Sequence, residues 1–156
     1  MRKEWAPYGP LVLRVILGFG FLYHGWPKLF SAAGHDQFAG MLSGIGIPAP
    51  GLMAWVVGLL EVVGGIALIA GAFVALFSAL FVIEMLVAMF TVHLSSGFNF
   101  INITGMTDAG PQFGMPGYEV NLLYIGGLIA IALVGAGAWS VDEMRAGRSH
   151  APPPAM

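Results

Sequence analysis

The stretch that decides the fold is residues 52–94, LMAWVVGLLEVVGGIALIAGAFVALFSALFVIEMLVAMFTVHL. A membrane-spanning helix needs about 20 mostly apolar residues to cross a hydrocarbon core about 30 Å thick. The tract is too long for one such span, and Gly71-Ala72-Phe73 near its middle offers a place for a turn. We therefore expect two membrane helices, at about 52–71 and 74–94, in which Glu61 and Glu84 are the only charged residues.

Two further segments have the length and apolar character of membrane spans, at about 10–30 and 119–138. The first is the less apolar of the two, because it carries Arg14, His24 and Lys28. A cleaved signal peptide is the alternative for this segment, since basic residues precede it and small residues follow it. Its internal polar residues interrupt the apolar run that a signal peptide requires, which favours a retained helix.

Composition supports a chain whose main solvent is lipid. Of the 156 residues, 58% are hydrophobic and 9% are charged, and the mean hydropathy is +0.84. Average soluble domains carry about 25% charged residues. The net charge of −2 provides no basic field for nucleic acid. Without cysteine there are no disulfides, thiolate metal sites or iron–sulfur clusters, so any redox chemistry depends on a cofactor or a partner.

The basic residues outside the four segments predict the orientation. Lysine and arginine precede the first segment or follow the last, and the loops at 31–51 and 95–118 contain neither. The positive-inside rule places both termini in the cytoplasm and both long loops outside. We expect an all-α integral membrane four-helix bundle forming a single domain, residues 1–143, followed by a disordered cytoplasmic tail, residues 144–156.

The two outer loops carry different signals. The first has apolar residues at helical spacing, with Asp36 as the expected N-cap and Pro48 as a stop, which predicts a short interfacial helix. The second is rich in Gly, Asn, Thr and Pro, and either a lid over a site or a mobile connector would fit it.

Counting 1.5 Å per residue gives each polar side chain a depth in the membrane. Lys28, His93 and Glu119 fall near the outer surface, His24 about one turn deeper, and Glu61 a turn below that. The count predicts an outward-opening polar funnel with Glu61 as its floor, and Asn121 follows Glu119 at the funnel's rim.

Arg14 and Glu61 each allow two interpretations. Arg14 either extends to the cytoplasmic interface or pairs with Glu61, whose expected partner on the first helix is therefore Arg14 or His24. Glu61 is either a functional group or a protonated structural carboxyl, and the glycines around it allow close helix packing.

Glu84 lies nine residues before His93. On a regular helix this spacing is about two and a half turns, so the two side chains point in opposite directions. If His93 points into the funnel, Glu84 faces out of the bundle at mid-membrane depth, where a bare carboxylate is costly. We therefore expect Glu84 to contact another protein chain, either a second copy or a membrane partner. A kink between the two residues is the alternative.

Several short motifs occur in an order that resembles the DoxX family of small bacterial membrane proteins. The resemblance covers residues 10–142. Its motifs are Leu13-Arg14, His24-Gly25-Trp26-Pro27-Lys28, Gly58-Leu-Leu-Glu61-Val-Val-Gly64-Gly65, the run from Met85 to His93, Gly97-Phe98, Gly117-Tyr118-Glu119 and Trp139-Ser140-Val-Asp142.

The resemblance implies a four-helix protein of the bacterial inner membrane with oxidoreductase-like character. It also implies kinship with the membrane subunit of a quinol oxidase, and soluble partners in complexes linked to oxidative stress and thiol detoxification. With the residues, it gives a first hypothesis: a multi-pass redox subunit that binds a quinone-like or other amphipathic molecule in the funnel.

In this hypothesis His24, Glu61 and His93 are the catalytic groups. Quinol oxidation releases protons, so these groups and Glu119 would accept them, while Lys28 would stabilise a developing oxyanion. Arg14, Lys28, Glu119 and Asn121 would contact the ligand, with a membrane or soluble redox partner or a second copy of the chain nearby.

Two other classes of function stay open: a proton or solute transporter, and a membrane scaffold for soluble redox enzymes. No metal-binding motif is present in the sequence. His24 and His93 differ in depth by about a turn, which is awkward for two axial ligands of one haem.

Overall fold

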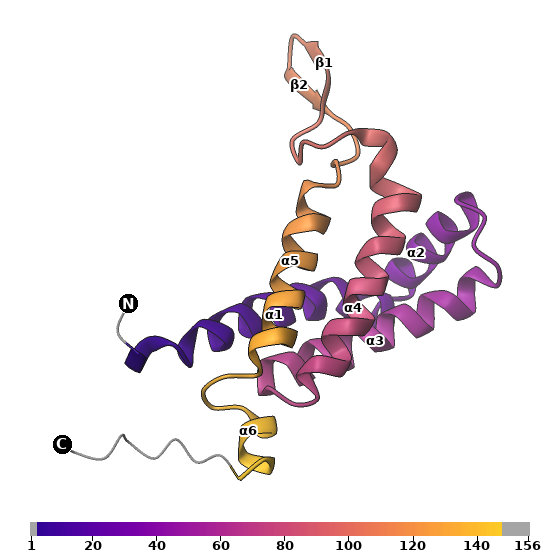
Figure 1. The fold of residues 1–156 in the computed structure, drawn as a ribbon. Coiled ribbons are helices and arrows are strands. Elements are labelled where there is room, and N and C mark those ends of the chain that lie inside the picture. The colour runs from indigo at the N-terminus through magenta and orange to yellow at the C-terminus, as the bar shows by residue number, and fades with distance from the viewer. Residues whose placement is uncertain (1–2, 148–156) are drawn as a thin grey trace.

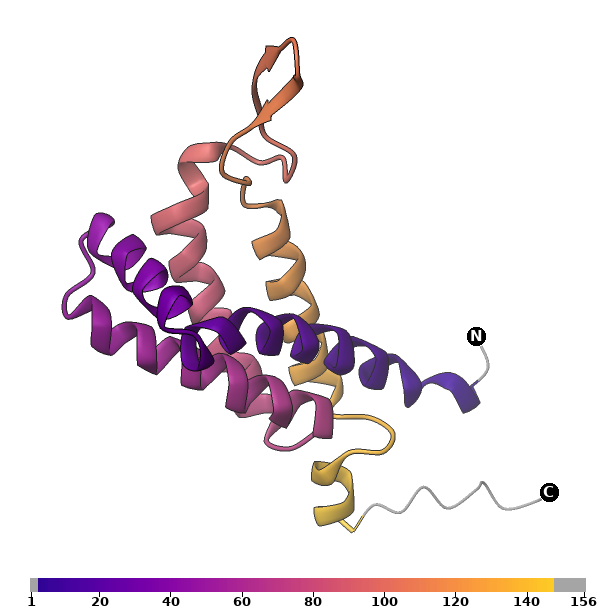
Figure 2. The same cartoon turned by 180° about the vertical axis from the view of Figure 1, so that it is seen from behind.

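The computed structural model describes residues 3–147. Its helical body consists of two antiparallel pairs, which cross each other rather than run along one axis (Figures 1 and 2). The first pair is α1 (Tyr8–Phe30) with α3 (Pro50–Ala70), and the second is α4 (Val74–Ala88) with α5 (Glu119–Val134). The chain is thus mostly helical, as the sequence predicts, and its four long helices are arranged as two crossed pairs.

Close backbone approach holds the α1–α3 pair together. A Cβ added at Gly18 would come within 2.7 Å of the Gly65 carbonyl oxygen, and one at Gly65 within 2.7 Å of the Gly18 carbonyl oxygen. Only glycine permits this spacing, because any side chain at either position would push the helices apart.

The apolar tract that predicts two helices has its turn at Gly71–Phe73. Gly71 and Phe73 both adopt left-handed backbone conformations, with φ of 69° and 51°, and α4 begins at the next residue. The last long helix ends at Val134, earlier than the predicted 138, because Gly135 and Gly137 also adopt positive φ values. A short helix, α6 (Val141–Arg145), follows.

The first loop contains α2 (Ala32–Gly44), which packs against both α1 and α3. Its N-cap is Ser31, whose Oγ accepts a hydrogen bond from the Gly34 amide at 3.2 Å. Asp36, the N-cap expected from the sequence, lies inside the helix instead.

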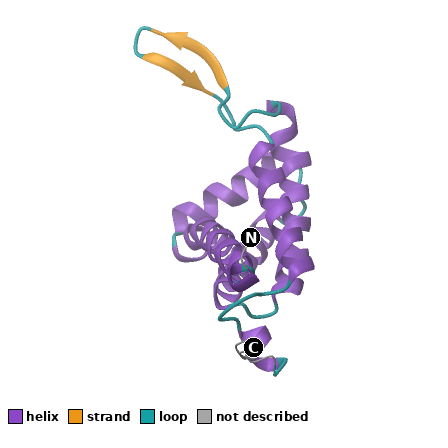
Figure 3. Cartoon of the chain, turned by 60° about the vertical axis from the view of Figure 1, so that its left-hand side comes forward, coloured by secondary structure: helices purple, strands orange, loops and turns teal. Residues whose placement is uncertain are grey.

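The second loop contains an antiparallel hairpin, which the all-α prediction lacks: β1 (Ile103–Thr107) and β2 (Gly110–Phe113). It stands away from the helices, as Figure 3 shows. Before it, α4 continues through a π-helical turn (Met89–His93) and a 3₁₀ turn (Leu94–Ser96). Residues 144 and 145, at the start of the predicted disordered tail, belong to α6, and residues 148–156 lie outside the described part.

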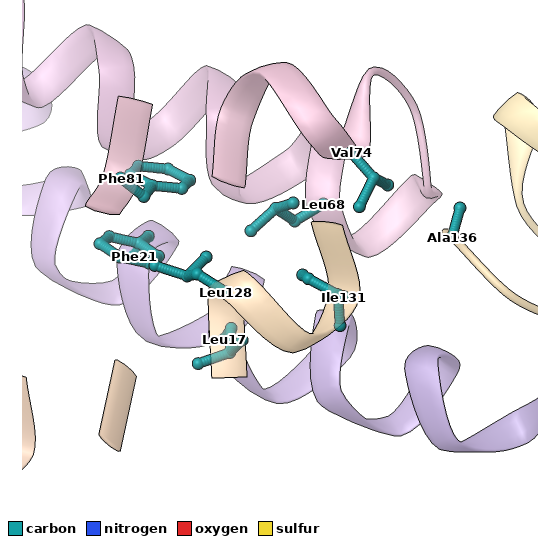
Figure 4. Close-up of a cluster of buried hydrophobic side chains, with 8 residues drawn as sticks. All are labelled: Leu17, Phe21, Leu68, Val74, Phe81, Leu128, Ile131 and Ala136. Carbon is teal, nitrogen blue, oxygen red and sulfur yellow. The ribbon is translucent and has the colours of Figure 1, made fainter. Parts of the chain in front are cut away.

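Aromatic and aliphatic side chains fill the core where the two pairs cross (Figure 4). Phe21 of α1 stacks on Phe81 of α4, with ring centroids 3.6 Å apart, and Tyr124 of α5 meets Phe21 edge-on. The buried cluster is completed by Leu17, Leu68, Val74, Leu128, Ile131 and Ala136.

The exterior of the helical body is apolar, whereas its charged side chains face inward. Arg14 and Glu61 are 1% and 3% exposed, while Phe19, Ile83 and Leu133 are 62%, 58% and 82% exposed. This distribution is the reverse of a soluble protein, in which ionised side chains are almost never buried.

Candidate functional site

An ion pair joins the C-terminal end of α1 to the middle of α3. The Lys28 ammonium contacts Glu61 Oε2, and the two side chains are 14% and 4% exposed. Glycines on both helices permit this approach: a Cβ at Gly25 would lie 2.6 Å from that of Glu61, and one at Gly58 would lie 3.1 Å from that of Lys28. The sequence named both charged residues but placed them two turns apart.

The direction of the lysine side chain explains the difference. Side chains on a helix point toward its N-terminus, so Lys28 extends back from the C-terminal end of α1 to the level of Glu61. Counting Cα positions alone does not include this reach. The predicted partners of Glu61 on α1 were His24 and Arg14, and neither forms the contact.

Glu84 of α4 faces the same ion pair. The rings of Phe77 and Phe81 pack against Gly64, which brings the face of α4 carrying Glu84 against the face of α3 carrying Glu61. Glu84 is close enough for Glu61 and Lys28 both to act on its carboxyl electrostatically. Its Oε2 atom is buried and has no hydrogen-bond partner. We call Lys28, Glu61 and Glu84 the ionic cluster.

This position contradicts the premise that Glu84 faces away from the bundle. Between Glu84 and His93 the helix changes to π-helical geometry, in which hydrogen bonds span five residues instead of four. The change adds roughly one residue per turn, or about 100° of rotation, so the half-turn count for a regular helix does not apply. Glu84 therefore gives no reason to infer a contact with another chain.

Helix α2 packs over the Lys28 side of the ionic cluster. The Phe38 ring lies 4.1 Å from the Lys28 ammonium, a cation–π contact. The Nδ1 atom of His35 lies 3.1 Å from the Lys28 carbonyl oxygen, and the His35 ring packs on Trp55. Sequence reasoning missed Phe38 and His35 as neighbours of the site, although Phe38 lies on the helix predicted in this loop and His35 directly precedes its expected N-cap.

Asn121 supports the cluster from α5. It is buried, and its Nδ2 donates to the Met85 carbonyl oxygen at 3.3 Å. Met85 directly follows Glu84, so this bond ties α5 to the part of α4 that presents the carboxyl. The predicted ligand-contacting residue thus makes a helix-to-helix contact next to the site.

The remaining predicted site residues are not gathered into one funnel. His24 shares a face of α1 with Lys28, one turn away, but its side chain is exposed and packs edge-on against Tyr23. His93 Nδ1 lies 2.8 Å from the Pro116 carbonyl oxygen, and Glu119 Oε2 accepts from the Phe100 amide at 3.0 Å. The last two therefore hold the base of the hairpin.

Two open hollows lie on the surface of the molecule. One, of about 430 Å³, is lined by Phe19, Leu22, Tyr23, Trp26 and Pro27 of α1. The other, of about 520 Å³, lies at the foot of the hairpin and includes Glu119. Neither is lined by a residue of the ionic cluster.

Arg14 binds backbone oxygens at the opposite end of the helical body. Its guanidinium donates to the carbonyls of Leu68 and Ile69 at the end of α3, and to those of Ala138 and Trp139 before α6. It does not pair with Glu61, one of the two alternatives drawn from the sequence, because Glu61 contacts Lys28 instead.

Asp142 completes this end. Its two carboxylate oxygens accept the amides of Phe73 and Val74 at 2.8 and 2.9 Å, which caps the start of α4. We call Arg14 and Asp142 the end clasp. Within residues 3–147, no three histidine, cysteine, aspartate or glutamate side chains are grouped so that they could hold a metal ion.

A family model for DoxX matches residues 9–94, which is more than half of the chain and includes all of the ionic cluster. The chain belongs to the DoxX family. The resemblance drawn from the ordered motifs is therefore confirmed.

Curated DoxX relatives come from several bacteria. The chain is 29% identical to "Inner membrane protein YqjF" of Escherichia coli over 91% of its own length and 95% of that protein. It is 36% identical to "Putative oxidoreductase CatD" of Bacillus subtilis over 58% of its length and 63% of that protein. An "Uncharacterized protein" of Haemophilus influenzae is 28% identical over 90% of the chain and 93% of that protein. No solved structure matches the chain.

The DoxX match and the helices both indicate a bacterial membrane protein. Two helical segments, Pro50–Ala70 and Val74–Ser96, are long and apolar enough to cross a membrane, and Glu119–Val134 is apolar but shorter. The membrane assignment thus rests on the family, the apolar exterior and these two helices together.

Proposed function

We propose that this DoxX protein is a four-span subunit of a redox system in the bacterial inner membrane. In this proposal it binds a quinone-like or other amphipathic molecule and exchanges protons with it through the ionic cluster. The observation that carries the proposal is the cluster itself: three ionisable side chains from three helices meet inside a body whose exterior is apolar. Ionisable groups at such positions are costly and usually functional.

The aromatic residues support four spans with both termini on the cytoplasmic side. Tryptophan and tyrosine concentrate at the two interfaces of a bilayer. Trp5, Tyr8 and Trp139 pack together at the end of the molecule that carries the end clasp. Trp55 packs on His35 of α2, and Trp26 packs on Phe30 at the C-terminal end of α1. Because the two helix pairs cross, at least one pair would be tilted from the bilayer normal.

The cluster has the chemistry that a dihydroxy aromatic ligand requires. A carboxylate accepts a proton from a ligand hydroxyl, and a lysine ammonium stabilises the negative oxygen that forms. Electrons released by such a ligand would pass to a membrane or soluble redox partner. The name of the Bacillus subtilis relative, a putative oxidoreductase, agrees with this class of function.

The test begins with the protein purified from bacterial membranes in detergent, followed by mass spectrometry of the bound lipids and an absorption spectrum. We expect close to one quinone per chain in the wild type. In Glu61→Gln we expect at least a tenfold loss, because the ligand loses its charged partner while the side-chain shape is kept. Glu143→Gln, a half-buried carboxylate on α6, is the matched control and should retain the quinone.

The other outcomes lead to different functions. A purified wild-type protein without quinone would contradict the proposal and favour a transporter or a scaffold. A Soret band would indicate haem instead. If Glu61→Gln retained quinone, the ligand would bind outside the ionic cluster, and the two surface hollows would be the candidate sites.

A further inference from the structure

The ionic cluster contains one basic group and two acidic groups in an apolar interior. If both carboxyls were ionised, the set would carry a net charge of −1 away from water. Uncompensated charge in such a place costs several kcal/mol, and proteins usually avoid the cost by moving a proton. The charge balance alone therefore calls for one additional proton.

The packing of α3 against α4 shows where that proton belongs. Phe81 packs on Gly64, so Glu84 and Glu61, each one turn from these residues, face each other across the helix interface. An ionised carboxylate can only accept hydrogen bonds, and two of them in contact repel. Glu84 Oε2 is buried without a donor, whereas Glu61 Oε2 has the Lys28 ammonium.

The other groups around the pair cannot supply a second positive charge. On α2, the His35 ring is turned to the Lys28 backbone carbonyl, and Phe38 is uncharged. On α5, the neighbouring polar group is the Asn121 amide, which does not titrate. On α1, the His24 side chain is exposed on the exterior. Among the described residues, Lys28 is therefore the cation that faces both carboxyls.

We propose that Glu61 and Glu84 share a single exchangeable proton, and that Lys28 balances the one negative charge that remains. The cluster is then a neutral site that stores one proton inside the apolar body. The inference rests on the proposed function and deepens it, since it defines the charge state in which the site meets its ligand. Its test is independent of any ligand.

The experiment is infrared spectroscopy of the purified protein at pH 7.5 in an ester-free detergent. Asp and Glu side chains in contact with water are ionised at this pH. A protonated carboxyl inside the protein gives a separate carboxylic acid C=O band, which shifts in D₂O. We expect such a band in the wild type, and its absence would overturn the proposal whether or not any variant folds.

Variants then identify which carboxyl groups carry the proton. Glu61→Gln and Glu84→Gln should each abolish the band, because the remaining carboxylate pairs with Lys28 and ionises. Lys28→Met should increase the band about twofold, because both carboxyls then take up a proton. Glu143→Gln should leave it unchanged, and far-UV circular dichroism checks the fold of each variant.

The outcomes separate this inference from the quinone proposal. A band that survives in Glu61→Gln or Glu84→Gln would show an independently protonated carboxyl and overturn the sharing. An unchanged band in Lys28→Met would show that Lys28 does not balance the remaining negative charge, which would contradict the proposal. A normal band in a protein that binds no quinone would uphold the shared proton and contradict only the proposed ligand.

Discussion

Arg14 and Lys28 lie on the same helix, yet their charged groups meet different kinds of partner. Arg14 donates to four backbone carbonyls at one end of the body, and the other member of the end clasp, Asp142, accepts two backbone amides. Lys28 contacts the carboxylate of Glu61 and the ring of Phe38, and Glu84 lies on the adjacent face of α4. Every partner in the end clasp is backbone, whereas every partner in the ionic cluster is a side chain.

This difference in partners distinguishes the end clasp, whose charges stabilise the fold, from the ionic cluster, whose groups can exchange protons. A carbonyl or amide of the backbone does not change its protonation state, so the charges of the end clasp have fixed partners. The carboxyls of the ionic cluster can gain or lose a proton, and one of their oxygens lacks a donor. Burial and charge alone do not distinguish these sites, because Arg14 and Glu61 are almost equally buried.

The largest expected effect is the loss of Arg14. Arg14→Leu leaves four carbonyl oxygens without their donor, and we expect the free energy of unfolding to fall by about 4 kcal/mol. Arg14→Lys should lose less, because it keeps one charged donor but not the planar fork. Thermal unfolding in detergent, followed by tryptophan fluorescence, measures both. If Arg14→Leu were as stable as the wild type, the structural role of the clasp would be wrong.

The second effect tests whether partners in the ionic cluster can be removed together. Glu61→Leu removes the carboxylate that contacts Lys28 and leaves the ammonium only the more distant carboxyl of Glu84 as a counter-ion, so it should cost about 3 kcal/mol. The double variant Lys28→Met/Glu61→Leu should recover most of this loss, because it removes both charges at once. The same unfolding assay applies. A double variant no more stable than Glu61→Leu would mean that the pair is needed for folding itself, as we expect of Arg14.

The smallest effect concerns the other half of the end clasp. Asp142→Ala removes the acceptor for the first amides of α4 and should cost about 1 kcal/mol, a typical value for a helix N-cap. Asp142→Asn keeps one acceptor oxygen and should cost less. Glu143→Gln, the next residue along α6, is the control and should change little. A loss for Asp142→Ala as large as for Arg14→Leu would show that the clasp acts as one unit.

Hydropathy was enough to place the long apolar helices and the turn between α3 and α4. Glu61 could also be identified, because a carboxylate in the middle of an apolar segment needs a partner inside the protein. Its partner could not be found by counting Cα depth, because Lys28 covers the difference with its own side chain. The sequence pattern gives the depth of a residue's Cα in the membrane, but not the position of the charged group at the end of a long side chain.

Three other features depend on information that the sequence pattern does not carry. The π-helical turn after Ala88 has no proline or glycine to mark it, so Glu84 was assigned to the wrong side of its helix. The partners of Arg14 are carbonyls, which every residue possesses. The crossing of the two helix pairs depends on side-chain packing around Phe21 and Phe81, which periodicity alone does not describe.

The hairpin between α4 and α5 has a consequence for biogenesis. In the proposed topology, the whole loop at 95–118 must pass through the bilayer while the protein is being inserted, and its backbone groups must leave water during that passage. Asp108 is its only charged residue, which keeps the energetic barrier to translocation low. The two apolar helices that flank the loop can then enter the membrane together, as one inserting unit that carries the hairpin across.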